Sequence, residues 1–144
     1  MDTKRFSIGT IVGAVTLLII GYVIFDWAFA AFYAANAGSA TGVERSEVVY
    51  WAVVLANLAY AALIMYAIGN RAGSLSILEG AKIGAIVGFL LWFTVNFFFY
   101  GYTNLSNLTK TIVDPLLEIV HAGIAGAVIA AVLKKVPASV PKPA

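Results

Sequence analysis

Four apolar stretches, each long enough to cross a lipid bilayer, constrain the fold of this chain more than any other feature. They cover residues 6–33, 48–69, 80–102 and 115–133. A helix that crosses the hydrocarbon core needs about 20 mainly apolar residues. Because lipid offers no partners to backbone N–H and C=O groups, a chain of this pattern crosses as helices. We therefore predict an all-α fold, with four transmembrane helices in an up-down bundle joined by short connections.

Composition agrees with a membrane protein and limits its chemistry. The 144 residues are 62% hydrophobic and 11% charged, whereas about a quarter of the residues in soluble domains are charged. We expect one bundle over residues 1–136, followed by a disordered proline-rich tail at 137–144. The absence of Cys excludes disulfides and thiolate metal sites. No basic run with interleaved aromatic residues indicates nucleic acid as a partner.

The first apolar stretch has an alternative interpretation as a signal peptide. Lys4 and Arg5 precede it, and Ala35-Asn36-Ala37 resembles a cleavage site. Its apolar region, however, is longer than the usual ~7–15 residues of a signal peptide. This length favours a transmembrane helix over a cleaved leader.

The distribution of Lys and Arg predicts the orientation of the bundle. Short cytoplasmic loops are enriched in these residues. If both termini are cytoplasmic, the outer side holds only Arg45 and Lys110, and the inner side holds Lys4, Arg5, Arg71, Lys82, Lys134, Lys135 and Lys142. The sequence therefore predicts that both termini are cytoplasmic, in the inner membrane of a bacterium.

Small residues recur every four positions in the inner halves of three stretches. This spacing lets helix backbones approach closely in lipid. We expect it to serve packing within the bundle, through Gly9, Gly13, Gly80, Gly84, Gly88 and Gly126.

Polar residues form a layer in the outer halves of the same stretches. Counted from the middle of each stretch at ~1.5 Å per residue, Asp26, Asn96 and Glu118 lie at one depth. His121, the only histidine, follows Glu118 by three positions and therefore shares its helix face. Asn57 lies near the middle of the second stretch. Ionisable residues inside membrane helices are rare and indicate function, so these five residues are candidates for binding a ligand, cation or proton.

Each member of this layer also has a structural interpretation. Asp114 before Pro115 is typical of a helix N-cap followed by proline at the first helical position. The two asparagines could serve as interhelical hydrogen-bond partners. Glu118-x-x-His121 has the spacing found in carboxylate-bridged metal bundles, and a mononuclear site would use Glu118, His121 and Asp26. The chain holds only one such motif, so no cofactor is strongly implied.

The chain resembles a group of small four-helix bacterial membrane proteins of unknown function. The resemblance is carried by the loop Asn36-Ala-Gly-Ser-Ala-Thr-Gly42, by the glycines from Gly80 to Gly88, and by Tyr102-Thr-Asn-Leu-Ser-Asn-Leu-Thr. It implies four helices in a bacterial inner membrane and transfers no catalytic residue.

Three classes of function remain open at this point. The first is a small transporter or a ligand- or cation-binding protein that uses the polar layer. The second is an accessory or assembly subunit whose polar layer only holds helices together. The third is a metal-dependent membrane enzyme. The compatible partners are the lipid bilayer, a second copy of the chain or another membrane protein.

Overall fold

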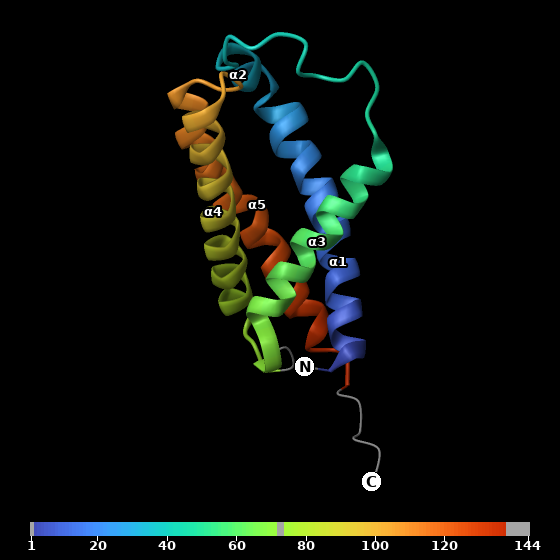
Figure 1. Ribbon diagram of the computed structural model, residues 1–144. Helices are drawn as coiled ribbons and strands as arrows, with labels where there is room; N and C mark the ends of the chain where they lie inside the picture. The colour runs from blue at the N-terminus through green and yellow to red at the C-terminus, as the bar shows by residue number, and fades with distance from the viewer. Residues whose placement is uncertain (1, 72–73, 138–144) are drawn as a thin grey trace.

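The computed structural model describes residues 2–71 and 74–137, and these form an antiparallel helical bundle (Figure 1). The predicted all-α fold is confirmed. The chain runs up through three consecutive helical segments, down through one helix, up through the next and down through the last, so that both ends lie at the same end of the bundle (Figure 1). The elements are α1 (Thr3–Gly21), the π-helix η1 (Tyr22–Ala28), α2 (Ala30–Ala35), α3 (Tyr50–Ile68), the short 3₁₀ turn η2 (Gly69–Arg71), α4 (Ile77–Tyr102) and α5 (Leu108–Leu133).

Four helical stretches among the described residues are long and apolar enough to cross a membrane. They are Thr3–Ala28, Tyr50–Ile68, Ile77–Tyr102 and Leu108–Leu133. Many large apolar side chains on these helices are exposed, as expected for a surface that faces lipid rather than water. These helices indicate an integral membrane protein. The predicted tail at 137–144 falls outside the described residues except for Pro137.

Local signals in the sequence set the ends of the helices. Ser76 and Glu79 form a capping box at the start of α4, in which each side chain accepts a hydrogen bond from the backbone N–H of the other. Helix α3 ends at Gly69, whose φ of 60° lies in the left-handed region that favours glycine. These residues therefore define both ends of the connection between α3 and α4.

The prediction that Asp114 caps the last helix is wrong. Helix α5 begins seven residues before Pro115, and its N-cap is Asn107, whose side chain accepts a hydrogen bond from the backbone N–H of Lys110 at 2.9 Å. Asparagine is among the best N-cap residues, so the helix begins there and tolerates Pro115 in its interior. Asp114 therefore does not cap the helix and lies on a buried face of α5.

The first predicted span is divided by an irregular segment. Within η1 the backbone follows the π pattern, as in the 2.9 Å hydrogen bond from the N–H of Phe29 to the carbonyl oxygen of Ile24, five residues earlier. Phe29 then leaves the helical conformation, and the short helix α2 follows. π-Helical turns occur mostly at functional sites, and this one faces the interior cavity described below.

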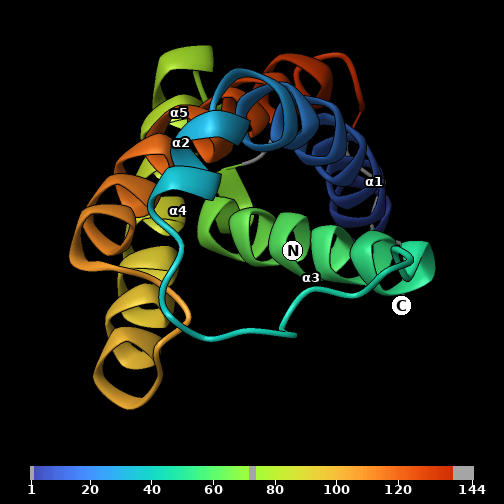
Figure 2. The same cartoon turned by 90° about the horizontal axis from the view of Figure 1, so that it is seen from above.

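Helices α4 and α5 pack backbone against backbone. Gly80, Gly84 and Gly88 are buried along one stripe of α4. A Cβ placed on Gly84 would collide with the carbonyl oxygen of Ala122, and one placed on Gly126 would collide with that of Gly80. Only glycine allows this approach, so the two helices form a closely joined pair, visible side by side in Figures 1 and 2.

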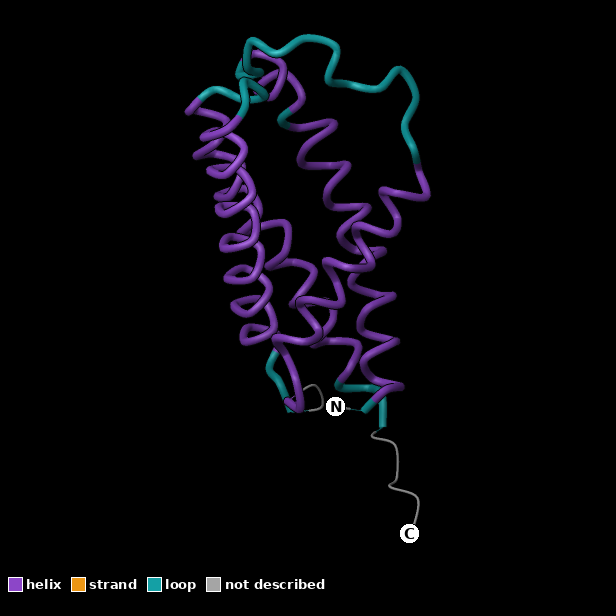
Figure 3. Tube along the Cα trace, in the orientation of Figure 1, coloured by secondary structure: helices purple, strands orange, loops and turns teal. Residues whose placement is uncertain are grey.

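The apolar core lies toward the end of the bundle that holds the termini. Its largest fully buried side chains belong to α1, α3 and α5, and include Leu17, Ile64, Met65, Ile68, Ile129 and Leu133. At the other end a long loop joins α2 to α3 and a short one joins α4 to α5 (Figure 3). The core therefore closes one half of the bundle and leaves the polar residues of the other half around a cavity.

Candidate functional site

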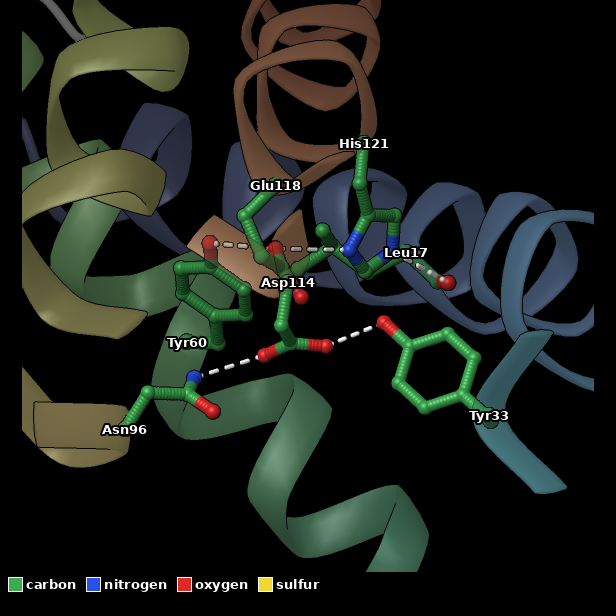
Figure 4. A network of polar contacts seen from close by, with 7 residues as sticks. All are labelled: Leu17, Tyr33, Tyr60, Asn96, Asp114, Glu118 and His121. Atoms are coloured by element: carbon green, nitrogen blue, oxygen red, sulfur yellow. Dashed lines mark hydrogen bonds and ion pairs between the residues drawn. The ribbon is translucent and has the colours of Figure 1, made fainter. Parts of the chain in front are cut away.

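Three ionisable side chains are buried on one stripe of α5. Asp114, Glu118 and His121 are exposed to only 8%, 2% and 5%, respectively. Their spacing of four and three residues places them on one face of the helix. This face points to the interior of the bundle, where other helices supply partners (Figure 4).

Glu118 and His121 form the inner part of the network. His121 Nδ1 lies 2.9 Å from Glu118 Oε2, and the Tyr60 hydroxyl on α3 donates to the same oxygen at 2.9 Å. His121 Nε2 lies 2.9 Å from the backbone carbonyl oxygen of Leu17 on α1. A Cβ on Gly21 would lie only 3.3 Å from that nitrogen, so the glycine lets the imidazole approach α1.

The partners of His121 determine how many protons the pair holds. A carbonyl oxygen only accepts, so Nε2 must carry a hydrogen. One further proton then joins Nδ1 to Glu118 Oε2, whether it rests on the nitrogen or on the oxygen. In both forms the pair is neutral overall, as suits two ionisable groups taken out of water together.

Asp114 forms the outer part of the network. One of its oxygens accepts a hydrogen bond from the Tyr33 hydroxyl of α2, and the other accepts from Asn96 Nδ2 of α4 at 2.6 Å. Figure 4 shows both contacts converging on this carboxylate. Lys110 lies over the far side of Tyr33, with Nζ 5.2 Å from the centre of the ring.

The network lines a cavity of about 940 Å³ between α1, η1, α3 and the α4–α5 pair. Most of the wall is apolar or aromatic, with side chains such as Leu18, Phe25, Leu63 and Leu91. The polar groups gather on the α5 side, and Asp26 adds a carboxylate from η1. Cavities that bind small molecules have this form, with apolar walls and a few convergent polar groups.

A second cavity of about 310 Å³ adjoins the first near the loops. Both are lined by Tyr33, Trp92 and Asp114, and the smaller one also by Asn96 and Lys110. The contact between Tyr33 and Asp114 therefore stands between the two cavities. Lys110, which lines the smaller cavity, lies on the loop side of the contact between Tyr33 and Asp114.

The structure brings together three of the five residues predicted for the polar layer. Glu118 and His121 are in direct contact, and Asn96 donates to Asp114, one turn before Glu118 on the same face of α5. Asp26 lies in the cavity wall, exposed, and makes no hydrogen bond or ion pair with any other described residue. Asn57 also lines the cavity, but its amide donates to the carbonyl oxygen of Val53 in its own helix at 2.9 Å.

Two tyrosines of the network were not among the predicted site residues. Tyr33 and Tyr60 supply the hydroxyl donors for Asp114 and Glu118. A tyrosine in the middle of an apolar span carries a polar hydroxyl that needs a partner when it is buried. That signal singles out Tyr60, which lies in the middle of α3.

The geometry does not support the metal site considered from the sequence. Within residues 2–71 and 74–137, no three His, Asp or Glu side chains are placed to hold a metal ion. Asp26 does not join Glu118 and His121, which are occupied by each other, by Tyr60 and by the Leu17 carbonyl.

Comparison of the chain with protein-family models, with curated proteins and with solved structures finds no match. The site must therefore be interpreted from its own geometry.

Proposed function

We propose that this protein binds a small amphipathic molecule inside the membrane, in the 940 Å³ cavity. The observation that carries the proposal is the combination of a large apolar chamber with a buried hydrogen-bonding network on one wall. Ligand cavities are typically about 300–1,000 Å³ and mostly apolar. The chamber lies in this range and has room for several rings or a branched alkyl group.

The polar network would orient a bound ligand. Its polar groups lie on α5 and on the facing tyrosines, whereas the opposite walls from α1 and α3 are mainly apolar. Trp92 adds a further polar group to this wall, because its Nε1 is buried close to the Tyr60 hydroxyl.

The orientation predicted from Lys and Arg indicates which side of the membrane the cavity would face. With both termini cytoplasmic in a bacterial inner membrane, the loop end of the bundle, and with it the polar network, faces outward. A small transporter would need such a site between its helices. Binding of a ligand in this cavity would thus also be a step of transport, if the protein is a transporter.

One observation favours a second candidate, an assembly subunit whose polar layer is structural. Four hydrogen bonds join side chains of α5 to α1, α2, α3 and α4. Interhelical hydrogen bonds of this kind add about 0.6 kcal/mol each on average in membrane proteins. On this interpretation the cavity would be filled by lipid and would show no saturable binding.

A cavity-filling variant separates the two candidates. Ala59 on α3 lines the cavity, and Leu55 on the same helix is 58% exposed and lies outside the lining. We expect 1-naphthylmethanol, a neutral aromatic alcohol, to bind saturably to the protein in lipid nanodiscs and to raise its thermal unfolding midpoint. Ala59→Trp should abolish this binding, because the indole occupies the chamber, and Leu55→Trp should preserve it.

The measurement is isothermal titration against nanodiscs with and without protein, together with a thermal scan. Partitioning into lipid is common to both kinds of nanodisc and is subtracted. The scaffold interpretation would be favoured if the naphthyl alcohol, the corresponding amine and the corresponding acid all showed no saturable component on the wild-type protein.

A further inference from the structure

The charges around the large cavity are of one sign. Among the described residues that line it, the carboxylates are Asp26, Asp114 and Glu118, and none is Lys or Arg. His121 is the one basic group of the lining. The remaining titratable groups of the wall are phenols, which are neutral near pH 7: Tyr22, Tyr33, Tyr50 and Tyr60.

His121 does not balance the carboxylates that remain. Its Nε2 is committed to the Leu17 carbonyl and its Nδ1 to Glu118. Because one proton joins that pair, Glu118 and His121 together contribute no net charge. The charge of the chamber therefore depends on Asp26 and Asp114.

Asp114 has only neutral partners. Its two oxygens accept from the hydroxyl of Tyr33 and the amide of Asn96, and no cationic group of the described chain lies within ion-pair distance. Lys110 lies one turn before Asp114 on α5 and lines the smaller cavity, with Nζ over the ring of Tyr33. A carboxylate exposed to only 8% is costly to bury unless a positive charge accompanies it.

Aromatic rings in the wall of the large cavity also favour a cation. Phe25, Tyr60 and Trp92 line the chamber beside the carboxylates. The face of such a ring attracts a cation within about 6 Å, and the attraction grows when water is excluded. An anion would meet two uncompensated carboxylates, and the one basic group of the lining, His121, is already bonded to Glu118 and Leu17, so the same wall rejects it.

We propose that the cavity selects an organic cation, a protonated amine on an apolar body, with the ammonium group between Asp26 and Asp114 and the body against α1 and α3. This inference rests on the proposed function, because it names the class of ligand for the same chamber. The carboxylates and rings discriminate by charge, and the apolar walls supply affinity for all ligands of suitable size.

A matched set of probes tests the charge preference. 1-Naphthylmethylamine, 1-naphthylmethanol and 1-naphthoic acid share the same ring system and differ mainly in the charge of the substituent at pH 7. On the wild-type protein in nanodiscs of zwitterionic lipid, the amine should bind at least roughly tenfold more tightly than the alcohol, because an ion pair in a partly buried site is worth several kcal/mol before desolvation. The acid should bind most weakly.

Neutralising single carboxylates identifies where the preference arises. Asp114→Asn keeps a side chain of the same shape that accepts from Tyr33, and it should weaken binding of the amine roughly tenfold more than binding of the alcohol. Asp26→Asn should act in the same direction and needs no rearrangement of hydrogen bonds, so it tests the proposal even if Asp114→Asn fails to fold. Glu44→Gln, which removes an exposed carboxylate from the loop between α2 and α3, is the matched control and should change neither affinity.

The failure of this inference is distinguishable from failure of the proposed function. If the alcohol binds as tightly as the amine, or if both aspartate variants retain the full preference for the amine, the charge selection is wrong and binding in the cavity stands. If none of the three probes binds saturably, the cavity is not a ligand site and both proposals fall.

Discussion

Gly84→Leu should lower the free energy of unfolding by about 3 kcal/mol, because it forces apart the two most closely packed helices of the bundle. Gly84 is buried, and even a Cβ at this position would meet the carbonyl oxygen of Ala122 in α5. A backbone oxygen cannot move aside like the end of a flexible side chain. The measurement is equilibrium unfolding in mixed micelles with increasing sodium dodecyl sulfate, followed by circular dichroism.

The matched control is Gly101→Leu in the same helix. A Cβ at Gly101 would meet nothing within 4 Å, and the residue is exposed near the end of α4. Leucine has a higher helix propensity than glycine, so this variant should be as stable as wild type or more stable. Equal destabilisation of the two variants would show that α4 and α5 do not pack through Gly84.

The second large effect is expected for His121→Leu, which should destabilise the protein by about 3–5 kcal/mol. The change removes the group that shares a proton with Glu118 and leaves that carboxyl buried with Tyr60 as its remaining partner. It also leaves the Leu17 carbonyl without the hydrogen bond from Nε2. Thermal unfolding of both proteins in nanodiscs measures the difference.

Glu118→Gln provides the comparison, and it should cost less than about 1 kcal/mol. Both contacts are made by the same oxygen, Oε2. A glutamine NH₂ in its place can donate one hydrogen to Nδ1 of a neutral His121 and the other to the hydroxyl oxygen of Tyr60, so both contacts survive with the direction of the Tyr60 hydrogen bond reversed. The double variant Glu118→Leu with His121→Leu should be more stable than His121→Leu alone, because it removes the unpaired carboxyl as well. The neutral, proton-sharing pair would be refuted if Glu118→Gln proved as damaging as His121→Leu.

The fold was predictable because its signals are physical requirements of the bilayer. Length and apolarity identify the four helices, and Gly69 marks the end of α3. Helix α4 begins at Ile77, before the predicted start at residue 80, because Ser76 and Glu79 cap it there. The alignment of Glu118 with His121 follows from helical spacing alone, and the structure places their side chains in contact. Depth along the helices suggested that Asn96 lies level with Glu118, but its amide donates to Asp114, one turn earlier in α5.

The rest of the site depends on how the helices rotate about their axes, which depth alone does not specify. Asn57 has a suitable depth, but its amide bonds within α3. Asp26 is displaced from the network because the backbone changes from α to π at Tyr22, which alters the direction of every later side chain. The prediction for Asp114 fails because proline is common at the first position of a helix, whereas Pro115 lies inside α5 and Asn107 is its N-cap.

The π-helix sets the direction in which the chain beyond α1 faces. At η1 the backbone changes from a hydrogen bond that reaches back four residues, from Tyr22 to Leu18, to one that reaches back five, from Phe29 to Ile24. The segment thereby holds one residue more than an α-helix of the same course would hold. If the same residues followed an ordinary α-helix, everything beyond them would be turned by about 100° about the helix axis. Tyr33 would then face away from Asp114, and the partition between the two cavities would open. The extra residue of the π-helix is therefore what keeps Tyr33 in the site.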